Sequence, residues 1–288
     1  MFSKVKNFFR SSKCNLPSVE IQETDNSWHG TYEFLNEKIK KVNTIDLSKE
    51  MNFNEILKFP IEYYKVPLTE WKMETHDAVI LRYIYRNFSP LRHLEFGTWK
   101  GEGVILCLNE CRSTVWTINL WEGEKGSNEG WAYGEKFENL DSLADQCNTK
   151  IFADPDGKPL MYHRTDSYGM IGRFYLEAGL GKRVCQIYCD SQEWDTSNYP
   201  KDFFDSCLID GGHSKEVVIN DTFKALEVTK SGGLVMWHDF CPDKVVLENC
   251  SAPRGVCEAI AEIYPELEKS FSKLFWIYPS WILVGIKK

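Results

Sequence analysis

Short apolar runs that alternate with helical patterns are the feature that most constrains the fold of this chain. Five of these runs are predicted as buried strands, at residues 91–96, 113–120, 184–188, 206–209 and 234–237. Helical patterns lie between most of them, and strands that alternate with helices form a parallel sheet covered on both faces. The sequence therefore predicts an α/β fold.

Two more β-rich runs, residues 274–278 and 281–286, are joined by only Pro279 and Ser280. So short a connection forces an antiparallel pair, because a parallel crossover needs roughly a dozen residues or more. We therefore expect a Rossmann-like, doubly wound, mostly parallel sheet of seven strands with an antiparallel C-terminal hairpin.

The chain of 288 residues suits one large domain with additions better than two equal domains. Residues 1–70 lack a sustained period and are predicted as an N-terminal extension, with the main domain at 71–288. A helical pattern from Thr75 to Phe88 opens that domain. The long, aromatic-rich stretch 123–164 is predicted as an insertion, either a lid or a plain structural addition.

The amino-acid composition of the chain limits the classes of partner that it can bind. The chain has 34 Lys and Arg against 42 Asp and Glu, a net charge of −8, and no long basic run, which argues against a nucleic-acid partner. Its 10 cysteines are scattered and no signal peptide is recognised, so we expect reduced thiols in a cytoplasmic protein. Residues 1–13 suit a weak membrane-surface helix or a terminal packing arm, and their shortness favours the arm. No apolar run approaches the ~20 residues that span a bilayer.

A glycine-bearing turn follows the first predicted strand. Glu95, Gly97, Thr98 and Gly101 fall in the segment E-F-G-T-W-K-G, whose glycines allow a sharp turn and a close approach to a ligand. The carboxylate can accept from an ammonium or hydroxyl group. A dehydrogenase loop would read G-x-G-x-x-G, and the third glycine is missing after Gly103, which disfavours that alternative.

Polar residues also follow the later strands. Asp210 and His213 follow the fourth strand, and His238 and Asp239 follow the fifth. Because the carboxyl ends of parallel strands form one edge, where ligands of open α/β sheets bind, we expect these four side chains to converge. Two histidines and two carboxylates at such an edge favour a functional role over a structural one.

The helix between these two strands has its own signals. Ser214 can cap it, and Ile219, Phe223 and Leu226 are predicted to face inward. Gly232-Gly233 is predicted to end it.

The glycine-bearing segment resembles the E-x-G-x-x-x-G loop of class I methyltransferases that depend on S-adenosylmethionine (SAM). The segments I-D-G-G-H and H-D-F resemble a small-molecule O-methyltransferase branch, and the resemblance covers about residues 75–287. It implies cofactor contacts from the strand ends and the turn, with the turn at the methionine end of SAM. The implied cofactor residues are Glu95, Gly97, Thr98, Gly101, Asn119, Glu122, Asp190, Ser191 and Asp210.

Asn119 departs from the family pattern, because an acid there usually holds the ribose hydroxyls. Glu122 is placed to supply the missing charge, and Asp190 and Ser191 correspond to the contacts with the adenine amino group. The family's metal-binding carboxylates correspond to Asp210 and the His238-Asp239 pair, which implies Mg²⁺ or another divalent metal. A histidine in place of a carboxylate leaves metal dependence open, because Mg²⁺ prefers oxygen ligands.

Methyl transfer requires the acceptor to be aligned and to lose a proton. His213 or His238 is suited to take that proton, since imidazole titrates near neutrality. The sequence therefore predicts a SAM-dependent methyltransferase acting on an oxygen of a polar small molecule, such as a sugar or glycosylated metabolite. The insertion 123–164 would then be an acceptor lid. A non-catalytic SAM-fold binding protein is the alternative, suggested by Asn119 and residues 1–70, and the oligomeric state, including a homo-oligomer, stays open.

Overall fold

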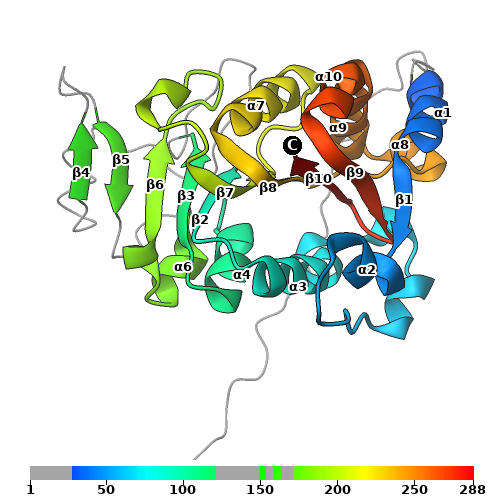
Figure 1. Ribbon diagram of the computed structural model, residues 1–288, viewed down its shortest axis with the longest axis horizontal. Helices are drawn as coiled ribbons and strands as arrows, with labels where there is room; N and C mark the ends of the chain where they lie inside the picture. The colour runs from blue at the N-terminus through cyan, green and yellow to red at the C-terminus, as the bar shows by residue number, and fades with distance from the viewer. Residues whose placement is uncertain (1–27, 121–149, 154–158, 164–170) are drawn as a thin grey trace, which may run out of the picture.

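The computed structural model describes residues 28–120, 150–153, 159–163 and 171–288, and its strands join one sheet (Figure 1). The sheet order is β1-β9-β10-β8-β7-β2-β3-β6-β5-β4. The strands are β1 Lys40–Asn43, β2 Arg92–Phe96, β3 Thr114–Asn119, β4 Lys150–Ala153, β5 Pro159–His163, β6 Val184–Tyr188, β7 Phe204–Ile209, β8 Thr229–Trp237, β9 Phe271–Tyr278 and β10 Ile282–Lys287.

The predicted fold class is confirmed. The strands β8, β7, β2, β3 and β6 are neighbours and mutually parallel, whereas β10 runs antiparallel to both β8 and β9. The predicted number of seven strands was wrong, since the described residues form a 10-stranded sheet. The additional strands β1, β4 and β5 lie toward the two edges. In β1, which reads K-K-V-N, only Val42 is buried, so no apolar run marks it.

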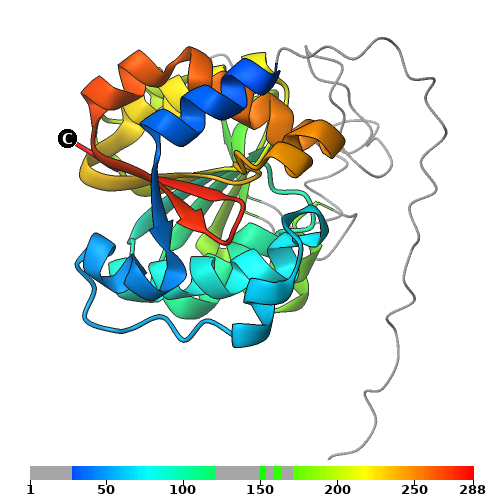
Figure 2. The ribbon, with the colours of Figure 1, turned by 90° about the vertical axis from the view of Figure 1, so that its right-hand side faces the viewer.

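Helices cover both faces of the sheet (Figures 1 and 2). One layer holds α1 Trp28–Lys38, α7 Lys215–Val228, α8 Lys244–Asn249, α9 Ser251–Glu262 and α10 Tyr264–Ser270. The other holds α2 Leu47–Met51, α3 Ala78–Phe88, α4 Glu102–Glu110 and α6 Arg173–Glu177. Each layer closes its own apolar core against the sheet.

The two cores follow from the alternation of side chains along each strand. In β8, Val235 and Trp237 enter the core beneath α7 and α9, while Leu234 and Met236 enter the core above α3 and α4. A strand buried on both faces is continuously apolar, which explains why its sequence was recognisable.

The segment before the central strands also agrees with the prediction. A π-helical turn, η4 Met73–Asp77, leads into α3, whose apolar face buries Ile80, Leu81 and Ile84 completely. Short 3-10 turns precede it at η1 Thr44–Asp46, η2 Ile61–Lys65 and η3 Leu68–Glu70, and two more follow later, η5 Gly181–Arg183 and η6 Thr196–Asn198.

Two details of α7 differ from expectation. The helix ends at Val228, and Gly232 and Gly233 lie inside β8, so the prediction that they end the helix was wrong. Phe223 was predicted to face inward but is 43% exposed. The other two residues predicted to face inward, Ile219 and Leu226, are partly buried and pack against the core, whose fully buried contacts from this helix come from Val218, Thr222 and Ala225. Ser214 holds the N-cap position, but its side chain makes no capping hydrogen bond.

Part of the predicted N-terminal extension contributes to the sheet, because β1 pairs with β9 in parallel. The predicted segment 1–13 lies outside the described residues. Of the insertion 123–164, only β4 and β5 are described, and they extend the sheet beyond β6 as an antiparallel pair. None of the described helices has the length and apolar character needed to cross a bilayer.

Candidate active site

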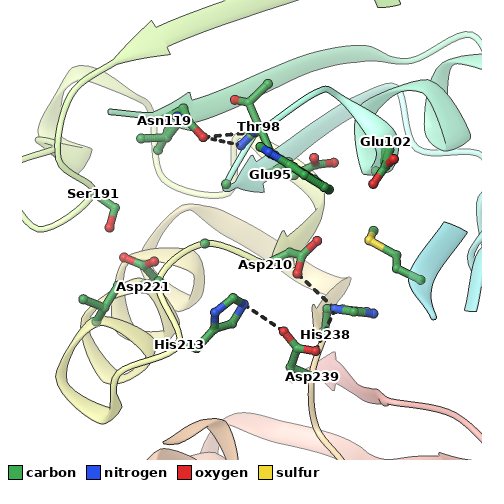
Figure 3. A pocket seen from close by; sticks show the side chains of 18 of the residues that line it. Glu95, Thr98, Glu102, Asn119, Ser191, Asp210, His213, Asp221, His238 and Asp239 are labelled. Carbon is green, nitrogen blue, oxygen red and sulfur yellow. Dashed lines mark hydrogen bonds and ion pairs between the residues drawn. The ribbon is translucent and has the colours of Figure 1, made fainter. Parts of the chain in front are cut away.

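A pocket of about 650 Å³ opens at the carboxyl ends of the parallel strands. Glu95 lies near the end of β2 and Asn119 ends β3. Asp190 follows β6, Asp210 follows β7 and His238 follows β8, and all five side chains line the pocket. Figure 3 shows Glu95, Asn119, Asp210 and His238 among the residues of this lining. The structure thus brings residues from five separate segments into one cavity.

The turn after β2 can be formed only with glycine at two positions. Gly97 has φ +91°, and a Cβ there would lie 2.1 Å from the carbonyl oxygen of Asp210. Gly101 has φ +86°, and its Cβ would lie 2.8 Å from the ring of Tyr175. The backbone of the turn therefore packs directly on the loop after β7, at the point where the two halves of the sheet meet.

Glu95 is a buried carboxyl group with an unused oxygen. Its side chain is 1% exposed, and Oε2 has no hydrogen-bond partner among the described residues. A Cβ on Gly103 would lie only 2.6 Å from that oxygen, so the glycine leaves the carboxyl uncovered. Burial, reinforced by the charge of Asp210, holds the pKa of Glu95 well above its ordinary value. This environment favours a ligand that brings a positive charge or N–H donors.

Asn119 shapes the turn. Its Oδ1 accepts hydrogen bonds from the backbone N–H groups of Thr98 and Trp99, both at 3.0 Å, and its Nδ2 donates to the carbonyl of Leu120. An amide thus serves here where the family resemblance led us to expect a carboxylate. The sequence predicted a contact with ribose, and the structure shows a second task, since Asn119 fixes the backbone of the loop.

The hydroxyl of Thr98 is hydrogen-bonded by residues that the sequence analysis did not predict. Its hydroxyl lies 2.6 Å from that of Thr117 and accepts a 2.9 Å hydrogen bond from Nε2 of Gln186. The hydroxyl of Tyr175 donates to Oε1 of Gln186. A lone amide inside the buried run V-C-Q-I-Y of β6 was the available signal for this network.

Of the remaining predicted cofactor residues, two line the pocket and one lies outside the described part of the chain. Asp190 and Ser191 line the pocket, and Asp190 accepts a hydrogen bond from the backbone N–H of Gln192. Glu122 lies outside the described residues, so its predicted contribution is untested.

His238 lies between three carboxylates. Its Nε2 is 3.1 Å from Asp77, while its Nδ1 is 3.0 Å from Asp210 and 3.5 Å from Asp239. Burial opposes a charge on this ring, but the charges of Asp210 and Asp239 outweigh that effect and hold its pKa well above the ordinary value. The surrounding carboxylates therefore favour the protonated form of His238.

His213 is the more accessible histidine. Its side chain is 43% exposed, and its Nε2 lies 2.8 Å from Oδ2 of Asp239. Burial would lower the pKa of His213, but the hydrogen bond and charge of Asp239 raise it overall. Asp239 has φ +56°, a backbone conformation that is uncommon outside glycine and concentrated at functional sites.

A cation could be held at this cluster. The ligand atoms of Asp210, His213 and Asp239 all lie within 4.8 Å of one another. This group shares two members with the set predicted from sequence, but it contains His213 in place of His238, whose nitrogens face carboxylates on both sides.

Two buried acids of the site were not predicted. Asp77, which is fully buried, accepts from Nε1 of Trp71 at 2.6 Å and contacts His238 from 161 positions away in sequence. Asp221 on α7 is also fully buried and lines the pocket. Neither acid lies in a recognisable motif, so no local pattern predicted either of them.

Indole and carboxyl groups line the pocket beyond the cluster. Trp71, Trp99 and Trp281 contribute aromatic surface, and Glu74 and Glu102 contribute carboxylates. Burial and the nearby charge of Glu74 raise the pKa of Glu102 to about 7. The lining therefore combines flat apolar faces with hydrogen-bonding groups.

Several solved structures are similar in fold. They include a putative O-methyltransferase from Klebsiella pneumoniae, with 15% identity and a TM-score of 0.45, covering 91% of this chain and 98% of that one. The O-methyltransferase TomG from Streptomyces achromogenes, in complex with SAM, has 13% identity and a TM-score of 0.43, with 93% and 100% covered. An O-methyltransferase from Bacillus cereus has 15% identity and a TM-score of 0.44, with 91% and 99% covered. Similarity at this level says nothing about the cofactor or acceptor of this chain.

A comparison with curated protein sequences found no match. The model of a methyltransferase domain family matches residues 94–240, which include the glycine turn and every strand end described above. The match covers more than half of the chain, from β2 to the residue after Asp239. This chain therefore belongs to the methyltransferase domain family and is a methyltransferase.

Proposed function

We propose that this methyltransferase takes its methyl group from SAM and transfers it to an oxygen of a polar small molecule, such as a sugar or glycosylated metabolite. One observation carries the proposal. A single pocket holds both the unpartnered carboxyl oxygen of Glu95, beside the glycine turn, and the bonded pair His213–Asp239.

The pocket suits the cofactor. SAM carries an ammonium group on its methionine end, and Glu95 offers that group a buried acceptor that lacks a partner. Gly103 keeps the space beside this carboxyl open, because a Cβ there would lie 2.6 Å from Oε2 of Glu95. Bound SAM would supply the activated methyl group, and the residues of this chain would orient it.

The His213–Asp239 pair suits removal of the acceptor's proton. Because Nε2 of His213 faces Asp239, Nδ1 is the nitrogen left to take the proton of an acceptor hydroxyl. Asp239 stabilises the imidazolium that results. His238 is already charged and enclosed by carboxylates, so we assign it a positioning role and assign the role of base to His213.

A divalent cation would be held by Asp210, His213 and Asp239, and it would supply Lewis-acid polarisation of the acceptor oxygen. Two carboxylates and one imidazole suit a transition metal better than Mg²⁺. A cation at this position would occupy the imidazole assigned above as the base, so the cation site and the base role of His213 are alternatives that the chelator test separates.

The polar acceptor is supported by the carboxylates of Glu74 and Glu102 on the pocket wall, which can bind hydroxyl groups. The acidic balance of the chain, 42 Asp and Glu against 34 Lys and Arg, supports a small molecule over nucleic acid. The cytoplasmic location remains a proposal that rests on the scattered cysteines of the sequence.

The test combines binding and turnover. Calorimetry should show that the purified protein binds SAM, and incubation with methyl-labelled SAM should label hydroxyl-rich acceptors such as glycosides. His213→Ala should bind SAM and transfer almost no label, which provides the control. Absence of SAM binding would contradict the cofactor assignment, whereas transfer to nitrogen alone would contradict the oxygen acceptor. Loss of activity with chelator, restored by one added metal, would establish the cation.

A further inference from the structure

Two cysteines place their sulfur atoms side by side at the end of α4 that lies away from the glycine turn. Cys107 lies in the last turn of the helix, Cys111 is its C-cap residue, and their Sγ atoms are 3.7 Å apart. The backbone N–H of Cys111 donates to the carbonyl of Cys107 at 3.2 Å, so the chain is still helical between them. The helix lies between α3 and α6 (Figure 1). The steps assigned to the pocket use neither thiol.

The local structure brings this pair within bonding reach. Four residues of α-helix rise about 6 Å, and the Cα atoms joined by a disulfide are typically about 4.4–6.8 Å apart. Cys185 and Cys189 have the same spacing in sequence, but Cys185 lies inside β6 and Cys189 directly follows that strand. An extended backbone separates such positions by roughly 13 Å. Of these two pairs, therefore, the helical one alone can close without movement of the backbone.

The two thiols of the helical pair differ in exposure and in acidity. Cys107 is fully buried, and burial holds the pKa of its thiol well above the ordinary value. Cys111 is partly exposed, and the hydrogen bond from Cys107 lowers the pKa of its thiol to about 7. Cys111 is therefore the sulfur that an oxidant can reach and the one that more readily forms a thiolate, which is the reactive form.

The guanidinium of Arg183 favours that thiolate. The C-terminal end of a helix disfavours a negative charge, and the Cys111 thiol can donate to the carbonyl of Cys107 at 3.2 Å, which stabilises the protonated form. Arg183 offsets both effects, because its positive charge contributes to the lowered pKa of Cys111. It also holds the end of the helix, since it donates at 2.9, 2.6 and 2.9 Å to the carbonyls of Leu108, Cys111 and Ser113.

We propose that Cys107 and Cys111 form a modification site at which hydrogen peroxide converts the two thiols into a disulfide. A partly exposed thiolate next to a second thiol is the arrangement of cysteines that sense oxidants. The inference does not depend on SAM or on the methyl acceptor, because the pair lies at the other end of α4 from the glycine turn.

The reaction proceeds in two steps. The thiolate of Cys111 attacks one oxygen of the peroxide, the O–O bond breaks, and the products are a sulfenic acid and hydroxide, which is protonated to water. The sulfur of Cys107 then attacks the sulfenic sulfur, an S–S bond replaces the S–O bond, and the hydroxide leaves as water with the proton of Cys107. The pair loses two electrons and two protons, and one peroxide is reduced to two molecules of water.

The experiment treats the full-length, reduced protein with hydrogen peroxide, stops the reaction with catalase and alkylates the remaining thiols in denaturant. Trypsin then separates the two pairs, because peptide 101–112 contains Cys107 and Cys111, and peptide 184–201 contains Cys185 and Cys189. Mass spectrometry should find peptide 101–112 without alkyl groups and lighter by two hydrogens. This product should form at least tenfold faster than the corresponding disulfide in peptide 184–201, and dithiothreitol should reverse it.

Either of two results would overturn the inference. In the first, peptide 101–112 keeps both alkyl groups while other cysteines of the chain are oxidised. In the second, the two peptides form disulfides at equal rates, which would show that the spacing in sequence suffices without the helix.

The order of the steps is tested with two variants. In Cys107→Ala the second thiol is missing, so Cys111 should stop at the sulfenic acid, which dimedone labels in peptide 101–112. In Cys111→Ser the remaining Cys107 should take up this label at least tenfold more slowly, because it is fully buried. Equal labelling of the two variants would contradict the assignment of Cys111 as the attacking thiol.

Discussion

Gly97 shows how closely one residue can determine the site. Gly97→Ala should abolish measurable SAM binding, because the added Cβ would meet the carbonyl of Asp210 at 2.1 Å and the loop would have to move. Gly232→Ala is the matched control, since Gly232 has a similar positive φ of +75° but open space where a Cβ would lie. Calorimetry with SAM on both variants checks the prediction. Similar affinities in the two variants would contradict the close approach of Gly97 to Asp210 as a requirement for SAM binding.

Mutation of the two histidines should have different effects, on catalysis for His213 and on stability for His238. His213→Ala should keep SAM affinity within a few-fold and lower kcat by roughly 10²–10⁴, the usual effect of losing a general base. Steady-state kinetics with a hydroxyl acceptor checks this expectation. Full activity in His213→Ala would remove this residue from proton transfer.

His238→Ala should instead act on stability. It leaves the fully buried Asp77 without its cationic partner, and breaking a buried pair typically costs about 3–5 kcal/mol. Urea unfolding of the two histidine variants gives the comparison. Equal unfolding free energies in both would contradict the structural charge assigned to His238.

Asp221 should make stability depend on pH. Its folded pKa of about 7 exceeds its ordinary value of 3.8, so between these values the folded chain retains a proton that the unfolded chain has lost. The contribution is present below pH 3.8 and is lost as pH rises through 7. Asp221→Asn should therefore stabilise the ligand-free protein by about 1–3 kcal/mol at pH 8 and much less at pH 4.5. Urea unfolding at both pH values tests this, and a pH-independent difference would contradict it.

At the scale of elements, α7 acts as a clamp on the loop after β6. Lys224→Met should weaken SAM affinity by roughly tenfold, because three carbonyls of that loop lose their donor. Lys215→Met provides the control on the same helix, since its surface ion pair with Glu262 contributes little. Calorimetry on both variants decides, and unchanged affinity in Lys224→Met would show that the loop holds its shape without the clamp.

Helices and strands could be predicted where their burial produces a continuous pattern of apolar residues in the sequence. The central strands and the C-terminal hairpin were predicted because apolar runs on both faces of a sheet are easy to see. The edge strand β1 was missed because its pairing with β9, and not its sequence, makes it a strand. The end of α7 was misplaced because Gly232 and Gly233 lie inside β8.

The site was predictable only where residues belong to local motifs. Asp210, His213 and Asp239 stand at strand ends, and the topology alone brings them together. Asp77 joins the same cluster through its contact with His238, which lies 161 positions away in the sequence. No local sequence pattern predicts such a contact. Asp221 is similar, since it lies on the buried face of an ordinary-looking helix.

For the whole molecule, cofactor binding should raise thermal stability by mass action. At a SAM concentration of 100 times Kd, the gain is about 2.7 kcal/mol, which corresponds to a Tm increase of roughly 4–5 °C for a chain of this size. Differential scanning calorimetry with SAM measures this, and ATP, which shares the adenosine but lacks the ammonium, should give a much smaller shift. Equal shifts with both ligands would contradict the part assigned to Glu95.

The position of β10 has a consequence for biosynthesis. This strand comes last among the described strands in sequence but sits between β8 and β9, so it joins the β1–β9 edge to the rest of the sheet. While the chain emerges from the ribosome, β8 keeps an unpaired apolar edge until residues 282–287 arrive. The nascent chain can therefore assemble its parallel core early, yet the edge of β8 stays exposed to wrong partners until β10 has emerged.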